Sequence, residues 1–254
     1  MDRRIISLGH ACQRGIQGTR HTGVVTEPVV RRVDFGYFVR PADETGTGSP
    51  RVDPCLGYLV DHPAGLLLLD SGMGTHPEVE AHYRPRRRSL AVALAAVGAR
   101  LEDIRLVANC HLHFDHCGGN PELAGRPIFA QRTELKAARE TVDYTLPDLV
   151  EGPSLRYEVL DGEAEVLPGV LIVPTPGHTL GHQTLVVRRA DGTVIVAGQS
   201  HNTASEYSAE VLAWRAQRDG HAPPLPLTPA WMARLQELDP ARVVFAHDHA
   251  VWEP

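Results

Sequence analysis

The sequence predicts an α/β protein made of two similar halves that pack on each other. Apolar runs with the length of buried strands alternate with segments of helical composition along the 254 residues. Twice, a strand pair and a helix lead to an apolar strand that ends near histidine, at 104–109 and at 242–246. Glycine and proline are spread along the chain, which is typical of many short elements joined by turns.

The first half contains apolar runs separated by clear turn signals. We expect strands at 55–60, 66–70 and 104–109. The second of these strands ends on the carboxylate of Asp70, and the breaker Ser71–Gly74 follows it. A helix is expected at 89–97, because Ser89 can cap its first turn and Gly98 can end it.

The second half has a similar layout. The expected helices are 132–139 and 231–238, and the expected strands are 155–160, 170–174, 184–188, 194–197 and 242–246. Two segments, 10–50 and 200–226, are rich in Pro, Gly and polar residues. We expect both to be long loops on the substrate side of a single domain that spans 1–254, because long loops in compact domains are often functional.

Composition excludes several classes of protein. Hydrophobic residues make up 43% of the chain and charged residues 22%, so a disordered or collagen-like chain is not expected. The net charge of −6 argues against a nucleic-acid partner. The longest apolar stretch, 90–99, has about half the ~20 residues that a membrane span needs. We therefore expect a cytoplasmic protein without a membrane partner, whose cysteines are free thiols because they form no CxxC pair.

The strongest chemical signal is the motif His111-x-His113-x-Asp115-His116, which follows a predicted strand. Alternate residues that leave a strand point to the same side, so His111 and His113 can converge on one ion. The glycines that follow, Gly118 and Gly119, allow a tight turn that aims Asp115 and His116 at a neighbouring point. Imidazole and carboxylate are ligands for zinc and similar divalent ions.

Two further histidines lie after predicted strands. His178 stands on a Pro/Gly loop, and His247 ends the last strand. Because the ends of such strands meet at one edge of a sheet, three distant segments can supply ligands to one site. We expect His182 to be structural and His249 to lie at the surface. Cys110 and Cys117 flank the first motif and either pack locally or act as redox-sensitive thiols.

Together these features resemble the metallo-β-lactamase-fold hydrolases, and especially their N-acyl-homoserine lactonase (quorum-quenching) branch. The similarity rests on His111–His116, the loop Thr175–His178, the turn Asp70–Gly72, the late His247, and stretches such as Gln131–Glu134. The resemblance implies a four-layer αβ/βα sandwich that binds one or two zinc or other divalent ions. One ion would be held by His111, His113 and His178, and the other by Asp115, His116 and His247. Asp70 would hydrogen-bond to the ligands.

The resemblance also implies a reaction and a substrate. A lactone or related ester would be opened by metal-bound hydroxide that attacks its carbonyl carbon, and Asp115 would pass a proton to the leaving alkoxide. Substrate contacts are expected from Phe114, Asn202 and Tyr207. Thioesterases, glyoxalase-type enzymes and biosynthetic tailoring hydrolases of the same fold are the alternative. The sequence leaves the oligomeric state open, with a homodimer as one alternative.

The sequence departs from the family at one ligand position. Where the family places a carboxylate that bridges two ions, this chain has Gln199, whose uncharged amide is a weaker ligand. His201, two residues later, is a candidate replacement. We expect the second ion to bind more weakly than the first.

Overall fold

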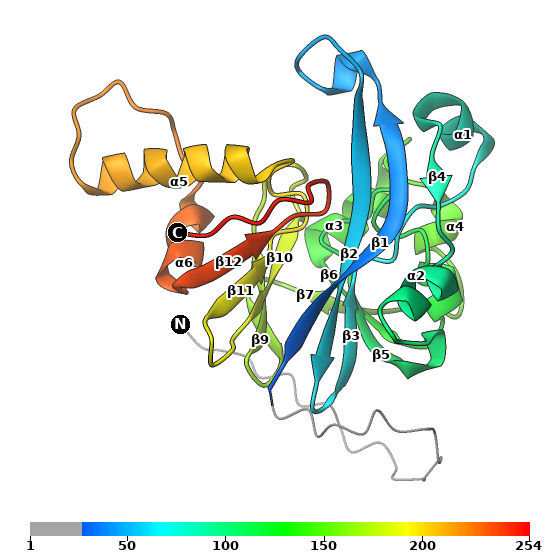
Figure 1. The fold of residues 1–254 in the computed structure, drawn as a ribbon. Coiled ribbons are helices and arrows are strands. Elements are labelled where there is room, and N and C mark those ends of the chain that lie inside the picture. Colours follow the sequence, from blue (N-terminus) through cyan, green and yellow to red (C-terminus); the bar gives the residue numbers. More distant parts are fainter. Residues whose placement is uncertain (1–26) are drawn as a thin grey trace.

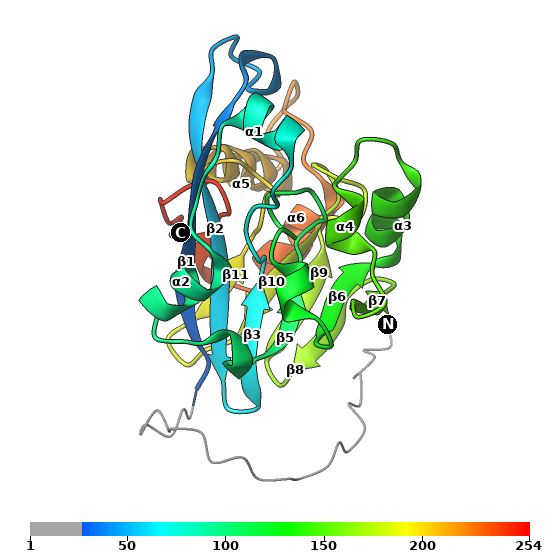
Figure 2. The ribbon, with the colours of Figure 1, turned by 90° about the vertical axis from the view of Figure 1, so that its right-hand side faces the viewer.

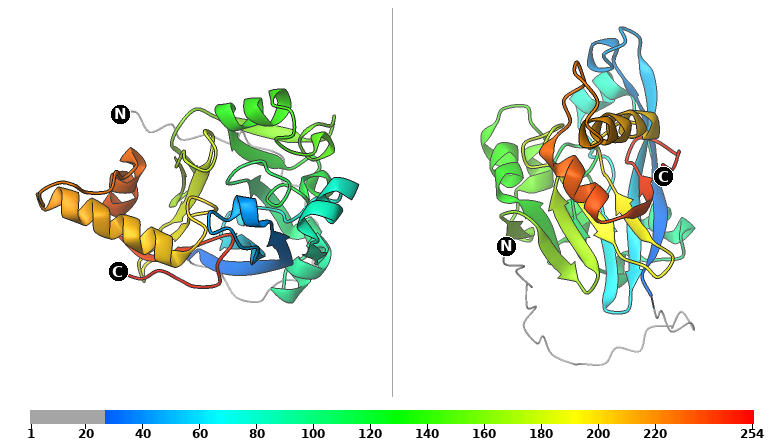
Figure 3. Two further views of the ribbon diagram at one scale, coloured as in Figure 1. Left: turned by 90° about the horizontal axis from the view of Figure 1, so that it is seen from above. Right: turned by 90° about the vertical axis from the view of Figure 1, so that its left-hand side faces the viewer.

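Two β-sheets pack face to face in the computed structural model, which describes residues 27–254. Helices cover the outer face of each sheet, so that the molecule has four layers (Figures 1 and 3). This arrangement confirms the α/β class that the sequence predicts. Within the described residues, no helix is both long enough and apolar enough to cross a membrane.

The larger sheet has seven strands in the order β4-β1-β2-β3-β5-β6-β7 (Figure 2). Their bounds are β1 Val29–Arg40, β2 Arg51–His62, β3 Gly65–Leu69, β4 Arg86–Arg87, β5 Ile104–Ala108, β6 Pro127–Gln131 and β7 Arg156–Leu160. Strands β3, β5, β6 and β7 run parallel, so their carboxyl ends lie at one edge of the sheet. The metal motif follows β5 at that edge.

The smaller sheet has five strands in the order β12-β11-β10-β9-β8. Their bounds are β8 Ala164–Leu167, β9 Val170–Pro174, β10 Gln183–Val187, β11 Thr193–Val196 and β12 Pro240–Val244. The turn between β9 and β10 carries His178, and His247 follows β12. The two sheets thus bring their histidine-bearing ends to the same end of the sandwich.

Six α-helices and three short 3₁₀ turns complete the described chain. The helices are α1 Pro77–Tyr83, α2 Leu90–Ala96, α3 Arg132–Glu140, α4 Pro147–Val150, α5 Ala204–Arg218 and α6 Ala230–Glu237, and the 3₁₀ turns are η1 Ala42–Glu44, η2 Leu101–Asp103 and η3 Asn120–Leu123. Helices α5 and α6 lie on the smaller sheet, where Tyr207 and Met232 pack against Phe245. On the larger sheet, Leu94 of α2 packs with Leu68 of β3.

The main core lies between the two sheets. It joins inward-facing apolar side chains of both, among them Leu56, Leu69, Phe129, Ile172 and Leu185, all of which are buried. Burial of this apolar surface is the principal force that holds the two halves together. The site at the strand ends therefore rests on a packed support from both sheets.

Parts of the two segments expected to be loops are regular elements instead. Residues 29–40 form the long strand β1, and only 10–26 of the predicted 10–50 loop lies outside the described residues. Pairing with β2 on both sides of a bulge between Asp34 and Tyr37 stabilises β1 despite its polar residues. Within 200–226, residues 204–218 form α5, whose first turn is closed by a capping box between Thr203 and Glu206. That T-x-x-E signal was present in the sequence.

Candidate metal centre

The motif after β5 is held in place by buried hydrogen bonds. The Asn109 side chain donates to the His116 carbonyl oxygen (2.9 Å), and the backbone N–H of Cys110 donates to Asp70 Oδ1 (2.8 Å). His111 and His116 are almost fully buried. The loop is therefore a fixed part of the structure, and its side chains have defined directions.

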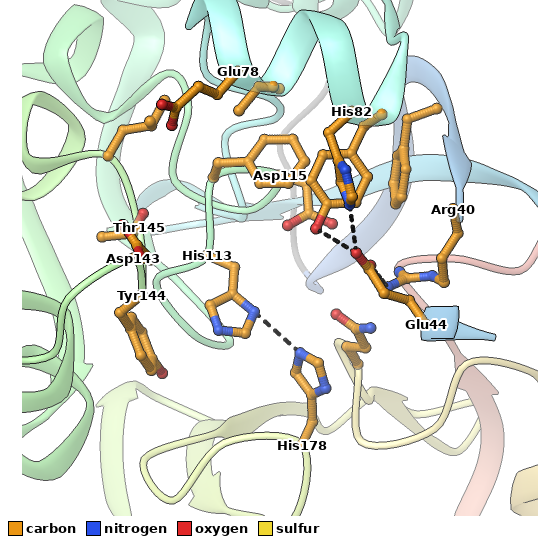
Figure 4. Close-up of a pocket in the computed structure, with 16 residues that line it drawn as sticks. Arg40, Glu44, Glu78, His82, His113, Asp115, Asp143, Tyr144, Thr145 and His178 are labelled. Atoms are coloured by element: carbon orange, nitrogen blue, oxygen red, sulfur yellow. Dashed lines mark hydrogen bonds and ion pairs between the residues drawn. The ribbon is translucent and has the colours of Figure 1, made fainter. Parts of the chain in front are cut away.

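A first group of ligand atoms comes from His111, His113 and His178. His113 Nδ1 lies 3.0 Å from His111 Nε2 and 3.2 Å from His178 Nε2. Figure 4 shows His113 and His178 pointing toward each other from separate loops. The structure thus brings together the three histidines expected to share one ion.

A second group comes from Asp115, His116 and His247. His247 Nε2 lies 3.3 Å from His116 Nε2, and Asp115 Oδ2 lies 3.5 and 3.6 Å from these two nitrogens. His247 Nδ1 donates to the Pro54 carbonyl oxygen (2.8 Å), which leaves Nε2 as the ring atom with the free lone pair. The second expected ligand set is therefore assembled as well.

The protonation states of the first group suit a cation. Burial lowers the pKa of His111 and His113, and it lowers the pKa of His178 to about 2. All three rings are neutral near pH 7, yet their nitrogens converge to within hydrogen-bond distance. Neutral imidazole nitrogens are zinc ligands, so the donor chemistry of this group fits a divalent ion.

The second group carries the negative charge of Asp115. Burial opposes that charge, but His116 and His247 outweigh it and lower the pKa of the Asp115 carboxyl. Burial lowers the pKa of His247 to about 4. For His116 burial also acts to lower the pKa, but Asp115 and Asp70 together raise it. A carboxylate beside two imidazoles again matches the preferences of zinc-type ions.

Asp70 contacts the candidate ligand His116 on the side of its ring that faces away from the two donor groups. His116 Nδ1 donates to Asp70 Oδ2 (2.9 Å), which directs His116 Nε2 toward Asp115 and His247. The Cys110 thiol donates to the same oxygen (3.1 Å) and is fully buried. Burial raises the pKa of Cys110 well above its usual value, so this thiol remains protonated.

Of the two candidate ligands after β11, Gln199 contacts the second donor group and His201 does not. Gln199 is buried with Oε1 3.2 Å from His116 Nε2, and its Nε2 donates to Asn202 Oδ1 (3.2 Å). His201 instead pairs with Glu210 of α5 and belongs to neither donor group. Gln199 thus reaches the second group, whereas His201 does not take the place of the missing carboxylate.

Tyr207 does not lie where a substrate contact was expected. It is fully buried in α5, packs on Phe245 and Trp252, and accepts a hydrogen bond from Gln236. The helix α5, which the sequence did not predict, directs this side chain into the core between α5 and the smaller sheet. The expectation that Tyr207 contacts the substrate is therefore wrong.

A cavity of about 410 Å³ opens above the two donor groups (Figure 4). Phe114 lines it, as expected for a substrate contact, together with His113, Asp115, His178 and Gln199. Other lining residues were not predicted from the sequence, namely Phe38, Arg40, Glu44, Glu78, Val79, His82, Tyr83, Asp143, Tyr144, Thr145 and Leu146. These come from β1, η1, α1 and the segment before α4, which carry no motif.

The turn after the motif tolerates no side chain at Gly118. An added Cβ would lie 2.1 Å from the Met73 carbonyl carbon and 2.2 Å from the Gly74 nitrogen, both backbone atoms that cannot move aside. We expect Gly118→Ala to lower the free energy of unfolding by about 3 kcal/mol. Urea unfolding measures this, with Gly152→Ala as the control because its Cβ would have no contact shorter than 3.8 Å. Equal stability of the two variants would contradict the packing argument.

Buried neutral histidines predict acid sensitivity of the metal-free protein. Burial lowers the pKa of His182 to about 3, whereas an unfolded histidine has a pKa of about 6.5. The contribution of neutral His182 to the free energy of unfolding is therefore fully present above about pH 6.5. It falls as the pH drops toward 3, because the histidine of the unfolded chain binds a proton at a higher pH than that of the folded chain. Between pH 7 and pH 5, His182 alone should cost about 2 kcal/mol of unfolding free energy.

Urea unfolding in the presence of a chelator at both pH values tests this loss. His182→Gln is the matched variant, because its side-chain oxygen can still accept the hydrogen bond from the Gln199 N–H (3.1 Å to His182 Nε2). The pH dependence should be smaller in that variant. Identical curves for wild type and variant would show that His182 does not contribute.

Comparison with known proteins gives a consistent result. The model of the metallo-beta-lactamase superfamily matches residues 50–247. An N-acyl homoserine lactonase of Bacillus cereus is 33% identical over 172 residues, which cover 62% of this chain and 68% of the relative. The N-acyl homoserine lactonase AiiA of Bacillus thuringiensis subsp. kurstaki is 33% identical over 174 residues, with the same coverage.

This chain is also similar to a solved structure, that of an N-acyl homoserine lactone hydrolase with the product N-hexanoyl-L-homoserine bound at its catalytic metal center. Its TM-score is 0.67 and its identity 25%, over 87% of this chain and 93% of that chain. This likeness confirms the predicted sandwich of two sheets between helices. The family model spans the segments that supply every donor atom of the two groups. The chain belongs to the metallo-beta-lactamase superfamily.

Proposed function

We propose that this protein is a metal-dependent hydrolase that opens the ring of N-acyl homoserine lactones, a quorum-quenching activity. The observation that carries the proposal is the convergence of two donor groups, His111/His113/His178 and Asp115/His116/His247, at one cavity. A divalent ion such as zinc, when bound there, supplies Lewis acidity and lowers the pKa of water to about 7. The names of the relatives at 33% identity support the choice of a lactone over other esters.

The side chains around the site have separable tasks. Asp115 presents an ionised carboxylate to the cavity, so a carboxylate oxygen that does not hold the ion can take the proton of the attacking water and return it to the leaving alkoxide oxygen. Asp70 keeps His116 in the tautomer whose Nε2 faces the site. Phe114 forms part of the cavity wall, and Asn202 holds the amide of Gln199 rather than lining the cavity itself.

Ring opening by the purified, zinc-loaded protein tests this function. N-hexanoyl-L-homoserine lactone should be converted to N-hexanoyl-L-homoserine, as measured by mass spectrometry and by the acid released. His111→Ala should lose the activity. Absence of turnover over a panel of lactones at defined zinc loading would refute the proposal, and turnover of acyl thioesters alone would select a thioesterase.

The two ions should differ in affinity. The second group holds its ion with one carboxylate, and the nearby Gln199 adds only a neutral oxygen. Repulsion between two divalent ions is then less well offset. After zinc loading and mild dialysis, we expect one ion per chain to be retained and the other to be largely lost. Elemental analysis by mass spectrometry measures this, and two equally retained ions would contradict the expectation.

A further inference from the structure

Arg40, at the end of β1, lines the cavity with a guanidinium group whose two terminal nitrogens make no hydrogen bond among the described residues. Its Nε donates to Asp53 Oδ2 (2.7 Å), and its guanidinium lies over the Phe38 ring, 5.2 Å from the centroid. Nη1 lies 3.7 Å from Glu44 Oε2, beyond hydrogen-bond distance, and Nη2 is buried without a partner among residues 27–254. The side chain lines the cavity but retains only 12% exposure.

The unpartnered Nη2 of Arg40 costs stability. A buried guanidinium nitrogen without an acceptor loses its hydration and gains nothing in return. The guanidinium is nevertheless held in place, because Asp53 is buried and accepts a hydrogen bond from Arg40 Nε. The contacts of Arg40 to Asp53 and Phe38 thus fix its position and leave Nη1, beside Glu44, as the terminal nitrogen that can donate to a molecule in the cavity.

Glu44 provides an acceptor beside these donors. Its Oε1 accepts hydrogen bonds from His82 (2.8 Å) and from the Tyr83 hydroxyl (3.1 Å), whereas Oε2 faces Arg40. Figure 4 shows Arg40 and Glu44 side by side in the pocket, with His113 and His178 across from them. Donor and acceptor therefore stand together on one wall of the cavity, away from the first donor group.

We propose that Arg40 and Glu44 recognise an amide in the acyl substituent of the substrate. The Arg40 guanidinium would donate to the amide oxygen, and Glu44 Oε2 would accept from the amide N–H. This proposal rests on the proposed function for the lactone half of the substrate and assigns two residues that determine specificity for the other half. Both residues bind the substrate and neither contacts the scissile bond.

A carboxylate is a poorer match for this wall than an amide. Two acidic side chains, Asp53 and Glu44, already flank Arg40, so a further negative charge would meet Glu44 at close range. An alkyl group would leave Nη1 of Arg40 without an acceptor. A neutral group that carries both an acceptor and a donor satisfies both residues at once.

The test uses zinc-loaded protein and three lactones with the same six-carbon tail. In these, the substituent is joined to the ring by an amide, by an ester or by a methylene group. Wild type should prefer the amide over the methylene compound by about tenfold or more in kcat/KM, with the ester between them. In Arg40→Met this preference should fall to less than threefold, mainly through a higher KM for the amide.

Arg51→Met is the matched control. Arg51 binds the same carboxylate of Asp53 but does not line the cavity, so its loss disturbs the ion pair without touching the ligand wall. It should retain the amide preference within about twofold. Arg40→Lys keeps a positive charge for Asp53 but lacks the paired terminal nitrogens of the guanidinium. It should also lose the preference for the amide over the methylene compound. This second variant keeps the test valid if Arg40→Met does not fold.

Outcomes separate the two proposals. If lactones are opened with equal kcat/KM for amide and methylene compounds, or if Arg51→Met behaves like Arg40→Met, the amide site is refuted and the lactonase function stands. If no lactone is opened, the lactonase function fails. Calorimetric binding of N-hexanoyl-L-homoserine then still decides, because Arg40→Met should weaken it about tenfold and Arg51→Met should not.

Discussion

Replacing Asp115 by asparagine should lower kcat for lactone opening by about 10³-fold. The carboxylate of Asp115 lies between His116 and His247, is buried, and has a lowered pKa, so it is ionised at neutral pH. Asparagine has the same shape but cannot take a proton from water or return one to an alkoxide. Steady-state kinetics at saturating zinc measure the loss.

A companion variant separates this effect from general damage. Asp148 lies exposed on α4, and Asp148→Asn should leave kcat unchanged. Zinc content is determined on the same samples, so that loss of an ion is distinguished from loss of the proton carrier. A kcat within tenfold of wild type for Asp115→Asn would mean that another group moves the proton.

Converting Gln199 to aspartate should tighten the second ion by about 10- to 100-fold. Gln199 is buried with Oε1 near His116, so a carboxylate at this position adds a negative charge beside the second donor group. Attraction between this charge and a divalent ion is strong in a site with little water. Competition with a chelating dye measures the affinity of each ion.

Gln199→Asn is the matched control, because it has the length of aspartate without its charge. The asparagine variant should bind the second ion no more tightly than wild type. If the two variants bind it equally, charge is not what limits the second site. Loss of the first ion in both would instead indicate that the loop after β11 has moved.

Much of the site could be predicted from local spacing. His111 and His113 are two positions apart at a strand end, and the turn at Gly118 follows directly, so their convergence depends on nearby backbone alone. His178 and His247 also follow strands, β9 and β12, whose apolar runs are clear. The helix α5 and the strand β1 were missed, because their polar faces and weak periodicity resemble loops.

Other features depend on contacts between segments far apart in the chain. β6 is a short run that begins with proline, and it is a strand because β5 and β7 pair with it on both sides. The burial of Tyr207 follows from packing of α5 on β12 residues that lie almost forty positions later. No pattern within either segment shows which face will be covered.

The sequence by itself determined which side chains are candidate metal ligands, because the residue types and their spacing at strand ends are local properties of the chain. Only the tertiary structure decided which side chains form the cavity wall above the donor groups. Arg40 and Glu44 face His113 and His178 because β1 pairs with β2, with a shift of register between Asp34 and Tyr37, and their hairpin extends over the strand ends. That register and the packing of the two sheets are set by burial of surfaces from distant segments, which residue spacing does not encode.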